Sequence, residues 1–569
     1  MKKMLLGLAL LTFLFSCGQK ETADLILTNA RVYTVHEKQP RAEAVAIRGD
    51  RIMAVGSAEE IAALRGDSTT VLDLGGRFLM PGFIEGHGHF SGLGNSLMNL
   101  NFLKSRNWDE IVAMVAEKAK TAKPGEWITG RGWHQEKWDK IPERNVLGYP
   151  YHDELSAVSP DNPVILRHAS GHGLFANKAA MDAAGVSAET PDPAGGEIVR
   201  DAAGNAIGMF EETAMGVINQ AYEAYLATLS EDEKLARWHR GIELAEAECL
   251  RKGITSFQDA GASFEEIERY RQLAESGKLD LRLWTMIRRP YAEMKDKLDG
   301  FPILNAGNHF FTCRAIKAAV DGALGSFGAW MLAPYNDKPN FTGQNTTPVS
   351  ELEQIAGLCL SHDLQFCVHA IGDRANREVL DIYEKTFATA PEKTDLRWRI
   401  EHAQHLDTAD IPRFKKLGVI ASMQAIHCTS DSPFVIKRLG EDRARYGAYA
   451  WRSLLDAGAV VTNGTDAPVE DVDPIPSFYA SVTRKRLDNP TPFFPEQKMT
   501  REEGLYAYTL ANAFAAFEED EKGSIEPGKL ADLVVLSHDL SQCSEDEIPE
   551  TKVWMTIVGG QIKFERAEK

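Results

Sequence analysis

Two histidines separated by one residue, His87 and His89, end an apolar run that begins at Phe78. Side chains two apart on a β-strand point to the same side, so both imidazoles can bind one metal ion. An H-x-H pair is by itself a weak signal, because two polar loop residues explain it equally well. The pair indicates a metal site only if other ligands come to the same place.

Other residues that can bind a metal stand at the ends of further β-like runs of the chain. His369 ends one run, His402 ends the next, and Asp466 ends a later one. Nitrogen and oxygen ligands of this kind suit a borderline-soft divalent cation. We therefore expect one or two divalent ions, most simply zinc, with the ligands within about 5 Å of a common point. The expected ligands are His87, His89, His369, His402 and Asp466.

A lysine, Lys317, lies in the run 314–321. An ammonium buried among metal ligands is strongly disfavoured, so this amine must be paired, neutral or chemically modified. Addition of CO₂ converts the amine to an anionic carbamate that can bridge two metals, and we favour this interpretation. An ion pair between Lys317 and Asp321 is the alternative.

Short β-like runs followed by helical stretches position these residues, as a parallel α/β sheet requires. Eight such units predict an α/β fold, a (β/α)₈ TIM-type barrel with its active groups at the C-terminal strand ends. We assign residues 80–515 to the barrel, with an insertion over its mouth at approximately 100–235. The eight runs are 78–86, 254–259, 281–287, 314–321, 365–370, 397–402, 419–424 and 460–466.

The two ends of the chain share a sequence pattern that differs from the pattern of the middle. Short alternating strands with turn signals occupy residues 23–79, and the same pattern returns in residues 516–569. We expect the two segments to form one small β-sandwich domain.

The first residues predict export and a lipid anchor. Met1-Lys2-Lys3 precedes an apolar run, residues 4–15, that is too short to span a membrane as a mature helix. Leu14-Phe15-Ser16-Cys17 resembles a bacterial lipobox, which implies lipidation of Cys17 and a signal and tether over residues 1–22. We expect an extracytoplasmic protein anchored to a bacterial membrane, in the periplasm or at the cell surface. A plain secretory signal is the alternative.

The overall charge restricts the partners. The 569 residues include 63 Lys+Arg and 82 Asp+Glu, a net charge of −19. A surface that follows phosphates needs clustered basic residues, so we expect no nucleic-acid partner and membrane contact through the lipid anchor only. A hydrophobic content of 44% is ordinary for a globular protein. A homodimer stays open.

Taken in order, the metal-ligand candidates and Lys317 resemble the amidohydrolase superfamily. Several longer segments are similar to its amidohydrolase 3 branch, which includes N-substituted formamide deformylase-like enzymes. The resemblance implies hydrolysis of a carbon–nitrogen bond, amide or formamide-like and not peptide, in a small molecule at a mono- or binuclear metal site. The segments that carry it are 369–374, 399–404, 422–431, 449–452, 464–470 and 523–532.

In the mechanism that we favour, His87 and His89 hold one metal, His369 and His402 hold the other, and carboxylated Lys317 bridges them. A bound metal lowers the pKa of its water to about 7. Asp466 is the expected catalytic residue, which takes the proton of that water and returns it to the leaving amine. Candidate substrate-binding residues are His172, His427 and Trp133, with Trp138 as a further pocket wall. Satisfied loop histidines and ordinary packing are the alternatives.

Two other functions remain as alternatives. Mononuclear aminohydrolases of the superfamily, which deaminate heterocycles, typically carry a glutamate shortly after the histidine of the fifth run and no lysine in the fourth. Here Ala370-Ile371-Gly372-Asp373 follows His369, and Lys317 is present. A non-catalytic tethered binding lipoprotein would lack ligands, whereas this set is complete.

Overall fold

The computed structural model describes residues 21–567, apart from 103, 134, 136–137, 169–172, 194–195 and 326. The expected signal segment with Cys17, and the candidate substrate-binding residue His172, lie outside these described residues. In the part of the chain that the structure covers, no helix combines the length and apolar composition needed to cross a membrane.

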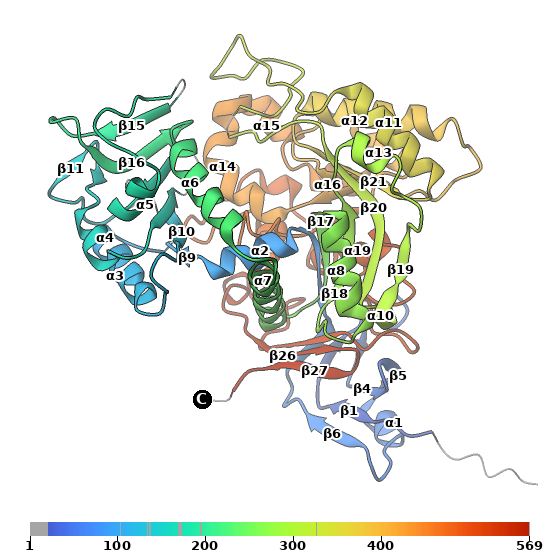
Figure 1. Cartoon of the computed structure of the whole chain (residues 1–569). Coiled ribbons are helices and arrows are strands. Elements are labelled where there is room, and N and C mark those ends of the chain that lie inside the picture. Colours follow the sequence, from blue (N-terminus) through green and yellow to red (C-terminus); the bar gives the residue numbers. More distant parts are fainter. Residues whose placement is uncertain are drawn as a thin grey trace, which may run out of the picture.

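Within the described residues, eight parallel strands follow one another in chain order at the centre of the molecule (Figure 1). Each strand pairs with the next in parallel, and β19 (Ile303–Asn305) adds an antiparallel partner to β20. The eight strands are β8 (Phe83–Gly88), β17 (Ile254–Ala262), β18 (Arg282–Ile287), β20 (Phe311–Ala319), β21 (Gln365–Ala370), β22 (Arg399–His402), β23 (Ile420–Met423) and β24 (Val461–Asn463). The predicted α/β fold with parallel strands is therefore confirmed.

The first and last strands meet beyond their ends. The backbone N–H of Asp466 donates to the carbonyl of His87 at 2.7 Å, and that of His89 donates to Ala467 at 2.7 Å. The Glu85 carboxylate of β8 accepts the backbone N–H of Thr465 at 2.6 Å. The strands thus form a nearly closed barrel, and their C-terminal ends surround one mouth.

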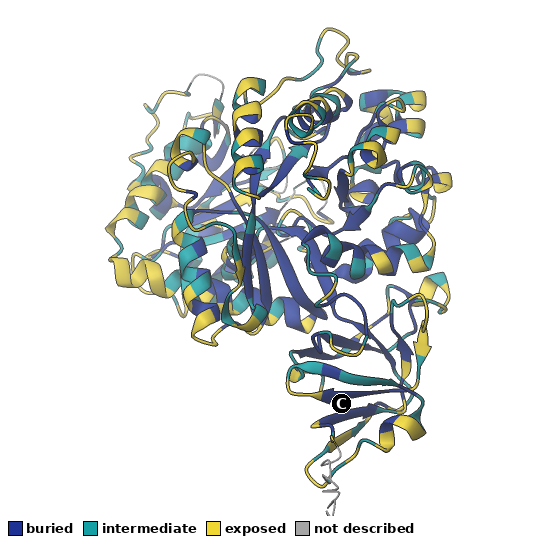
Figure 2. Cartoon of the chain, turned by 90° about the vertical axis from the view of Figure 1, so that its right-hand side faces the viewer, coloured by how far each residue is buried: buried dark blue, intermediate teal, exposed yellow. Residues whose placement is uncertain are grey.

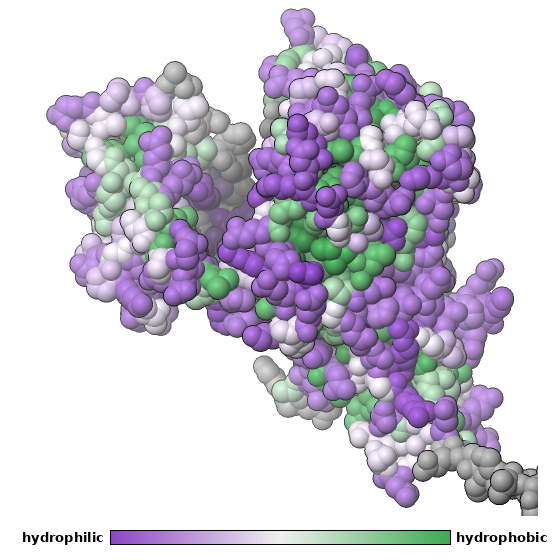
Figure 3. All heavy atoms as spheres, turned by 45° about the vertical axis from the view of Figure 1, so that its right-hand side comes forward, coloured by the Kyte–Doolittle hydropathy of each residue, from purple (hydrophilic) through white to green (hydrophobic). Residues whose placement is uncertain are grey.

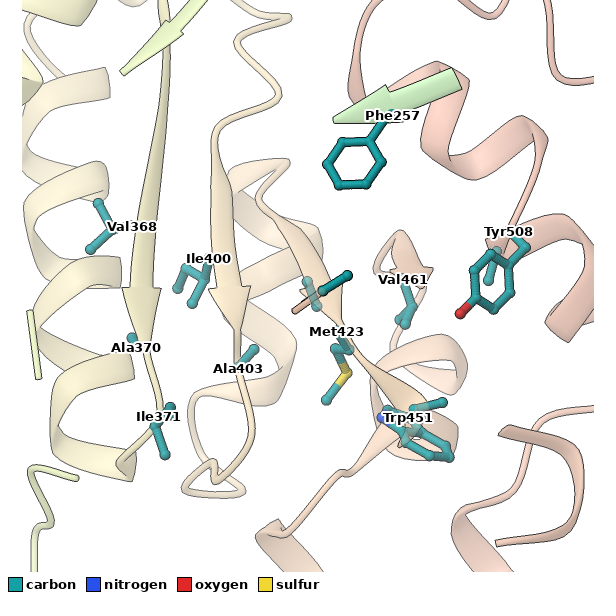
Figure 4. Packing of buried hydrophobic residues seen from close by; sticks show 14 of the residues in the cluster. Phe257, Val368, Ala370, Ile371, Ile400, Ala403, Met423, Trp451, Val461 and Tyr508 are labelled. Carbon is teal, nitrogen blue, oxygen red and sulfur yellow. The ribbon is translucent and has the colours of Figure 1, made fainter. Parts of the chain in front are cut away.

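The side-chain alternation of the strands decides which residues face the inside of this barrel. Phe366, Val368 and Ala370 of β21 belong to the large apolar cluster between the strands and the helices (Figure 4). Cys367 packs in a separate small cluster inside the barrel. Since side chains on a strand alternate, His369 shares the inner side with Cys367.

Helices between the strands cover the outside of the barrel, with buried residues toward the strands and exposed residues outward (Figure 2). In α12, buried Ala375, Val379 and Tyr383 recur every four residues, the spacing of one helix face. The covering helices include α7 (Glu231–Arg251), α8 (Phe264–Glu275), α11 (Val349–Ser361), α12 (Asp373–Phe387), α13 (Ile411–Leu417), α14 (Ala425–Leu439), α15 (Glu441–Gly447), α16 (Trp451–Asp456), α17 (Pro474–Thr483), α18 (Arg501–Ala507) and α19 (Leu510–Ala515).

Two smaller sheets lie below the barrel in Figure 2. One has the order β5-β4-β1-β6 and the other β27-β26-β25-β7-β2-β3. Leu27, Val45, Leu79, Leu533 and Ile557, which come from both sheets, pack in one apolar cluster. The strands are β1 (Leu25–Thr28), β2 (Arg31–Tyr33), β3 (Arg41–Ala42), β4 (Ala44–Arg48), β5 (Arg51–Gly56), β6 (Thr70–Asp73), β7 (Phe78–Pro81), β25 (Leu533–Leu536), β26 (Val553–Val558) and β27 (Gln561–Glu565).

The predicted first run, 78–86, is divided between these two parts of the molecule. β7 ends at Pro81 and pairs with β25, whereas β8 starts at Phe83 and pairs with β17. Pro81 has no N–H to continue a ladder. A side chain at Gly82 would come within 2.2 Å of Thr255, so glycine permits the close approach to β17. A single apolar run therefore serves two sheets.

Residues between β8 and β17 build a further lobe beside the barrel (Figures 1 and 3). Its sheet has the order β15-β16-β14-β13-β10-β9. The Arg131 guanidinium donates to the carbonyl of Pro468 at 3.1 Å, which joins this lobe to the loop after β24. Its main elements are β9 (Leu100–Asn101), α3 (Trp108–Ala119), β10 (Ile128–Trp133), α4 (Asp153–Val158), β13 (Val164–His168), β14 (Gly173–Ala176), α5 (Lys178–Ala183), β15 (Gly196–Arg200), β16 (Ala206–Glu212) and α6 (Met215–Thr228).

Candidate active site

The residues expected to bind metal gather at the mouth of the barrel. His87 lies on β8, Lys317 on β20, His369 on β21 and His402 at the end of β22. His89 caps α2 (Phe90–Met98), and Asp466 follows β24. Two sets of three have ligand atoms within 4.8 Å of one another, namely His87, His89 and Asp466, and His402, His427 and Asp466.

A cavity of about 410 Å³ opens onto these residues. Its floor is polar, and its wall includes apolar side chains from the loop after β20 and from α14. The cavity is lined by His89, Arg288, Lys317, Ala319, Ala323, Leu324, Gly325, His369, Ile371, His402, Gln404, His427, Asp431, Phe434, Asp466, Val469 and Glu470.

His87 is held by a buried acid behind it. Its Nδ1 donates to the Glu401 carboxylate, whose other oxygen lies 2.7 Å from Nε of Arg399. Although burial raises the pKa of Glu401, Arg399 and His87 outweigh it and hold that pKa well below its usual range. Burial lowers the pKa of His87 to about 4. The imidazole is therefore neutral, with the lone pair of Nε2 on the side of Lys317.

His402 is oriented in the same way by an amide. Its Nδ1 donates to Oε1 of Gln424 at 2.6 Å, which leaves Nε2 without a proton. Burial holds the pKa of His402 well below its usual range. The ring centre of His402 lies 4.7 Å from that of His87 and 4.5 Å from that of His369.

His369 is in the cluster, but its Nε2 lies 3.5 Å from Oδ1 of Asp321 and belongs to neither set of three. The ring centres of His369 and His402 are nevertheless 4.5 Å apart, and the pairing of these two histidines on one metal stays a prediction. The Asp321 carboxylate accepts three backbone N–H groups, those of Trp330, Ile371 and Gly372. Burial raises its pKa to about 7 despite these bonds.

The Lys317 amine points to the histidines and not to Asp321. Its Nζ lies 3.3 Å from Nε2 of His87. Among the described residues, no ion pair joins Lys317 to Asp321, whose carboxylate is bonded to the backbone instead. Burial lowers the pKa of Lys317 to about 8. The ion-pair alternative has no support in this geometry.

Asp466 is at the centre of the arrangement. Its Oδ1 lies 3.2 Å from Nε2 of His89, and its Oδ2 lies 3.5 Å from Nε2 of His427. Although burial raises the pKa of Asp466, its close contacts with the imidazoles of His427 and His89 hold that pKa well below its usual range. Nδ1 of His427 lies 3.6 Å from Glu470. These two acids outweigh burial and raise the pKa of His427 to about 10.

The donor atoms suit a divalent cation. Nε2 of His369 and Oδ1 of Asp466 are buried and, in the described part of the chain, make no hydrogen bond of good geometry, although Asp321 lies 3.5 Å from the first atom and His89 lies 3.2 Å from the second. Buried polar atoms without a partner need an explanation, and a bound ion is one. Neutral imidazole nitrogens beside a carboxylate, each with an orienting group behind it, are the usual surroundings of zinc.

Trp133 does not reach the cavity. Its indole is fully buried in the lobe beside the barrel, and Nε1 donates to the carbonyl of Leu166 at 2.9 Å. Its ring packs against those of Trp138, His168 and Phe175. The expected substrate contacts of Trp133 and Trp138 are therefore corrected to core packing, because the apolar cluster of the lobe takes up both indoles.

Glu401, Gln424, Arg288 and Glu470 belong to the site or support it, and no role was predicted for them from the sequence. A signal for Glu401 was present, since Arg399 and Glu401 are two apart on β22 and so share one side of the strand. Gln424 directly follows β23. It therefore lies at the C-terminal end of a strand, as His369 and His402 do. Arg288 directly follows β18 and therefore also lies at the C-terminal end of a barrel strand.

An amidohydrolase family model matches residues 70–564. The chain belongs to the amidohydrolase family. The matched segment includes every expected metal ligand, and the resemblance inferred from the sequence is confirmed.

Individual relatives cover nearly the whole chain. The protein LONG AFTER FAR-RED 3 of Arabidopsis thaliana is 32% identical over 95% of this chain and 91% of its own length. An N-substituted formamide deformylase of Arthrobacter pascens is 30% identical over 95% of this chain and 98% of its own length. A metal-dependent hydrolase of Pyrococcus horikoshii, of uncharacterised function, shares the fold with a TM-score of 0.73 and 24% identity, over 92% of this chain and 99% of its own.

Proposed function

We propose that this amidohydrolase family member is a metal-dependent enzyme that hydrolyses a non-peptide carbon–nitrogen bond, amide or formamide-like, of a small molecule. The observation that carries the proposal is the convergence of His87, His89 and Asp466, with ligand atoms within 4.8 Å of one another, beside a cavity that His89 and Asp466 line. The deformylase of Arthrobacter pascens, which is similar over nearly its whole length, supports this choice of bond.

The residues that would hold one or two divalent ions, most simply zinc, are His87, His89, Lys317, His369, His402 and Asp466. A bound divalent metal lowers the pKa of water to about 7 and polarises a carbonyl oxygen. Glu401 and Gln424 fix the tautomers of His87 and His402, so that both Nε2 atoms keep a lone pair that can bind a metal. These orienting bonds also make the imidazoles better donors.

Lys317 would serve as a carbamate. The amine adds CO₂ through its lone pair, forms a nitrogen–carbon bond and releases a proton, and the product is an anion. Burial lowers the pKa of Lys317 to about 8, so a fraction of the amine is neutral at pH 7. Since Nζ of Lys317 lies 3.3 Å from Nε2 of His87, a carbamate on this amine would lie beside the metal ligands and could contribute an oxygen ligand.

Asp466 is the proposed catalytic residue. Its carboxylate takes a proton from the attacking water and returns it to the leaving amine. His427, whose Nε2 lies 3.5 Å from Oδ2 of Asp466, helps to keep this carboxylate ionised and fixed in orientation. His427, placed between Asp466 and Glu470 in the cavity lining, is the proposed substrate-binding histidine.

Neither alternative function is favoured. After His369, the nearest acid in sequence is Asp373, which accepts the backbone N–H groups of Leu332 and Arg374 and does not line the cavity. It is therefore not placed to shuttle protons in a deamination. A non-catalytic binding protein would have no need for donor atoms oriented from behind by Glu401 and Gln424.

The proposal also includes the detailed type of barrel, the β-sandwich domain and the cellular location of the protein. The eight parallel strands and covering helices support a (β/α)₈ TIM-type barrel, and the shared apolar cluster of the two small sheets supports one β-sandwich domain. The lipobox-like Leu14-Phe15-Ser16-Cys17 supports lipid attachment at Cys17 outside the cytoplasm.

Metal analysis combined with a panel of N-formyl, N-acyl and cyclic amide substrates tests the proposed function. Release of an amine that depends on bound metal supports it. Release of ammonia from a heterocycle would favour deamination instead.

A further inference from the structure

Asp321, two residues after β20, is a buried acid beside the metal-ligand candidates. Its side chain is fully buried, and the backbone holds its carboxylate by both oxygens. Oδ2 accepts the N–H groups of Trp330 and Gly372, each at 2.8 Å, and Oδ1 accepts that of Ile371 at 3.0 Å. Three backbone donors fix the orientation of this carboxylate and favour its ionised form.

The same bonds close the loop that follows β20. Trp330 lies in this loop, part of which lines the cavity. Ile371 and Gly372 directly follow β21, whose end is seen in Figure 4. A side chain at Gly372 would come within 2.0 Å of the carbonyl oxygen of Trp330, so glycine permits the loop to approach. Asp321 thus connects the cavity-lining loop to the end of the strand that carries His369.

The ring of His369 turns one edge toward this carboxylate. Nε2 lies 3.5 Å from Oδ1 of Asp321 and is buried, whereas the side chain as a whole is 20% exposed and lines the cavity. The exposed part of the His369 side chain therefore lies away from Nε2. A distance of 3.5 Å is longer than a good hydrogen bond, so this contact is a close approach. Within the described ranges, Nε2 makes no hydrogen bond of good geometry to any other group.

The acid decides which ring nitrogen of His369 carries the proton. An ionised carboxylate only accepts hydrogen bonds, so it favours a proton on the nitrogen that faces it. For His369 that nitrogen is Nε2, and Nδ1 is left with the lone pair. His87 is held the opposite way, because Glu401 accepts from Nδ1 and leaves Nε2 with the lone pair. The two histidines therefore need acids on opposite edges of their rings.

We propose that Asp321 is a positioning residue for the metal site, which accepts the Nε2 proton of His369 and so directs Nδ1 of that ring toward the ion. This inference rests on the proposed function, because it assigns His369 to a metal. Asp321 does not line the cavity, so it acts through His369. Since the same carboxylate closes the cavity-lining loop, the position of this loop and the orientation of His369 depend on each other.

Asp321→Asn tests the proposal, because the amide keeps the size of the side chain but turns one acceptor into a donor. Oδ2 accepts two N–H groups, so the amide oxygen takes that place and the NH₂ group comes to lie beside Nε2 of His369. A donor there favours the tautomer with its proton on Nδ1. We expect zinc affinity to fall by about 10- to 100-fold, as for other groups that orient a histidine ligand.

The affinity is measured by competition with a fluorescent zinc chelator at pH 8. This pH lies above the pKa of about 7 to which burial raises that of Asp321, so the wild-type carboxylate is ionised. Melting temperatures of the same samples record the cost of the substitution to the fold.

Asp373→Asn is the matched control. Asp373 is also buried and joins the same loop to the start of α12, since it accepts the N–H groups of Leu332 and Arg374. In the part of the chain that the structure describes, no hydrogen bond or ion pair joins it to a histidine. We expect Asp373→Asn to lower the melting temperature but to keep the zinc affinity of the wild type. Equal losses of affinity in Asp321→Asn and Asp373→Asn would overturn the proposal.

A double-variant cycle with His369→Ala separates positioning from a general loss of structure. If Asp321 acts through His369, adding Asp321→Asn to His369→Ala should lower the zinc affinity no further. The same additional loss with and without His369 would overturn the proposal.

The tautomer of His369 gives a readout that needs no substitution at Asp321. In zinc-loaded protein with nitrogen-15-labelled histidine, the ring signals that disappear in His369→Ala belong to this residue. Long-range proton–nitrogen correlations should place its proton on Nε2 in the wild type. A proton on Nδ1 would overturn the proposal, whether or not Asp321→Asn folds.

The zinc measurements do not require an active enzyme. If no amide is hydrolysed but Asp321→Asn loses zinc affinity and Asp373→Asn does not, the proposed function fails and the role of Asp321 stands. If amides are hydrolysed and the two variants bind zinc equally well, the role of Asp321 fails and the proposed function stands.

Discussion

The amine of Lys317 lies 3.3 Å from Nε2 of His87, whose Nδ1 is bonded to Glu401. A lysine amine beside a neutral imidazole nitrogen, both fully buried, is an unfavourable arrangement for an ammonium. Two outcomes relieve it, namely loss of the proton or conversion to an anion that binds metal with the histidines.

Lys317→Ala tests which outcome holds. If the carbamate bridges the metals, the variant should lose metal and lower kcat/KM by more than the about 100-fold that loss of an orienting partner costs. Acetate or formate should restore part of the activity by filling the bridging place. Metal content is measured by mass spectrometry of the purified protein. Lys385→Ala, an exposed lysine on α12 paired with Glu353, is the control. Unchanged metal content and turnover would end the carbamate proposal and favour a mononuclear site.

Glu401→Gln tests the orienting role of the buried acid behind His87. The amide keeps the size of the side chain but removes the charge that pairs with Arg399. We expect metal affinity to fall by about 10- to 100-fold, as for other groups that orient a histidine ligand. Competition with a fluorescent zinc chelator measures the affinity. Glu378→Gln, a more exposed acid paired with Arg374, should leave it unchanged. Equal affinities for the two variants would contradict the role assigned to Glu401.

The pH dependence of stability tests a buried histidine outside the ligand set. Burial lowers the pKa of His405 to about 3, so this ring is neutral in the folded protein but takes up a proton near pH 6.5 when unfolded. The unfolded state then binds more protons below pH 6.5, and stability falls as the pH falls. Relative to His405→Gln, the wild type should lose about 1 kcal/mol between pH 6.5 and 5.5. Urea unfolding at both pH values measures the loss, and parallel curves for the two proteins would refute it.

Cys17→Ser tests the proposed lipid attachment. A single acyl chain binds a membrane only marginally, whereas multiple chains anchor firmly, so removal of the modified residue should release the protein from the membrane. Fractionation of the producing bacterium, followed by detection in the membrane and soluble fractions, measures this. Full retention of the variant in the membrane fraction would show that Cys17 does not carry the anchor.

Much of the site was predictable because its residues end strands. The C-terminal ends of parallel strands meet at one mouth, so His87, His369, His402 and Asp466 could be placed together from their positions in the sequence alone. The alternation of side chains also predicts that Lys317 faces the inside, together with Ala315 of the same strand.

Other features depend on contacts between distant strands. The bond between His87 and Glu401 joins residues 314 apart, and nothing local in either strand specifies the register that brings them together. Nor does local sequence decide which side of a sheet faces a cavity. Trp133 was therefore expected in the pocket, whereas the sheet of its lobe turns it inward. The orientation of His369 toward Asp321 depends on a loop that folds back over β21.

The central claim is that bound metal and Asp466 together hydrolyse a carbon–nitrogen bond. The most direct measurement strips the purified protein of metal, adds back zinc in steps, and follows amine release from the amide panel in wild type and Asp466→Asn. We predict that the amine-release rate of the wild type rises in proportion to bound zinc up to one or two ions per chain. Asp466→Asn should be slower by about 100-fold or more at any zinc content, as expected for loss of a general acid–base. Full activity in the metal-free protein, or an Asp466→Asn variant as active as the wild type, would contradict the claim.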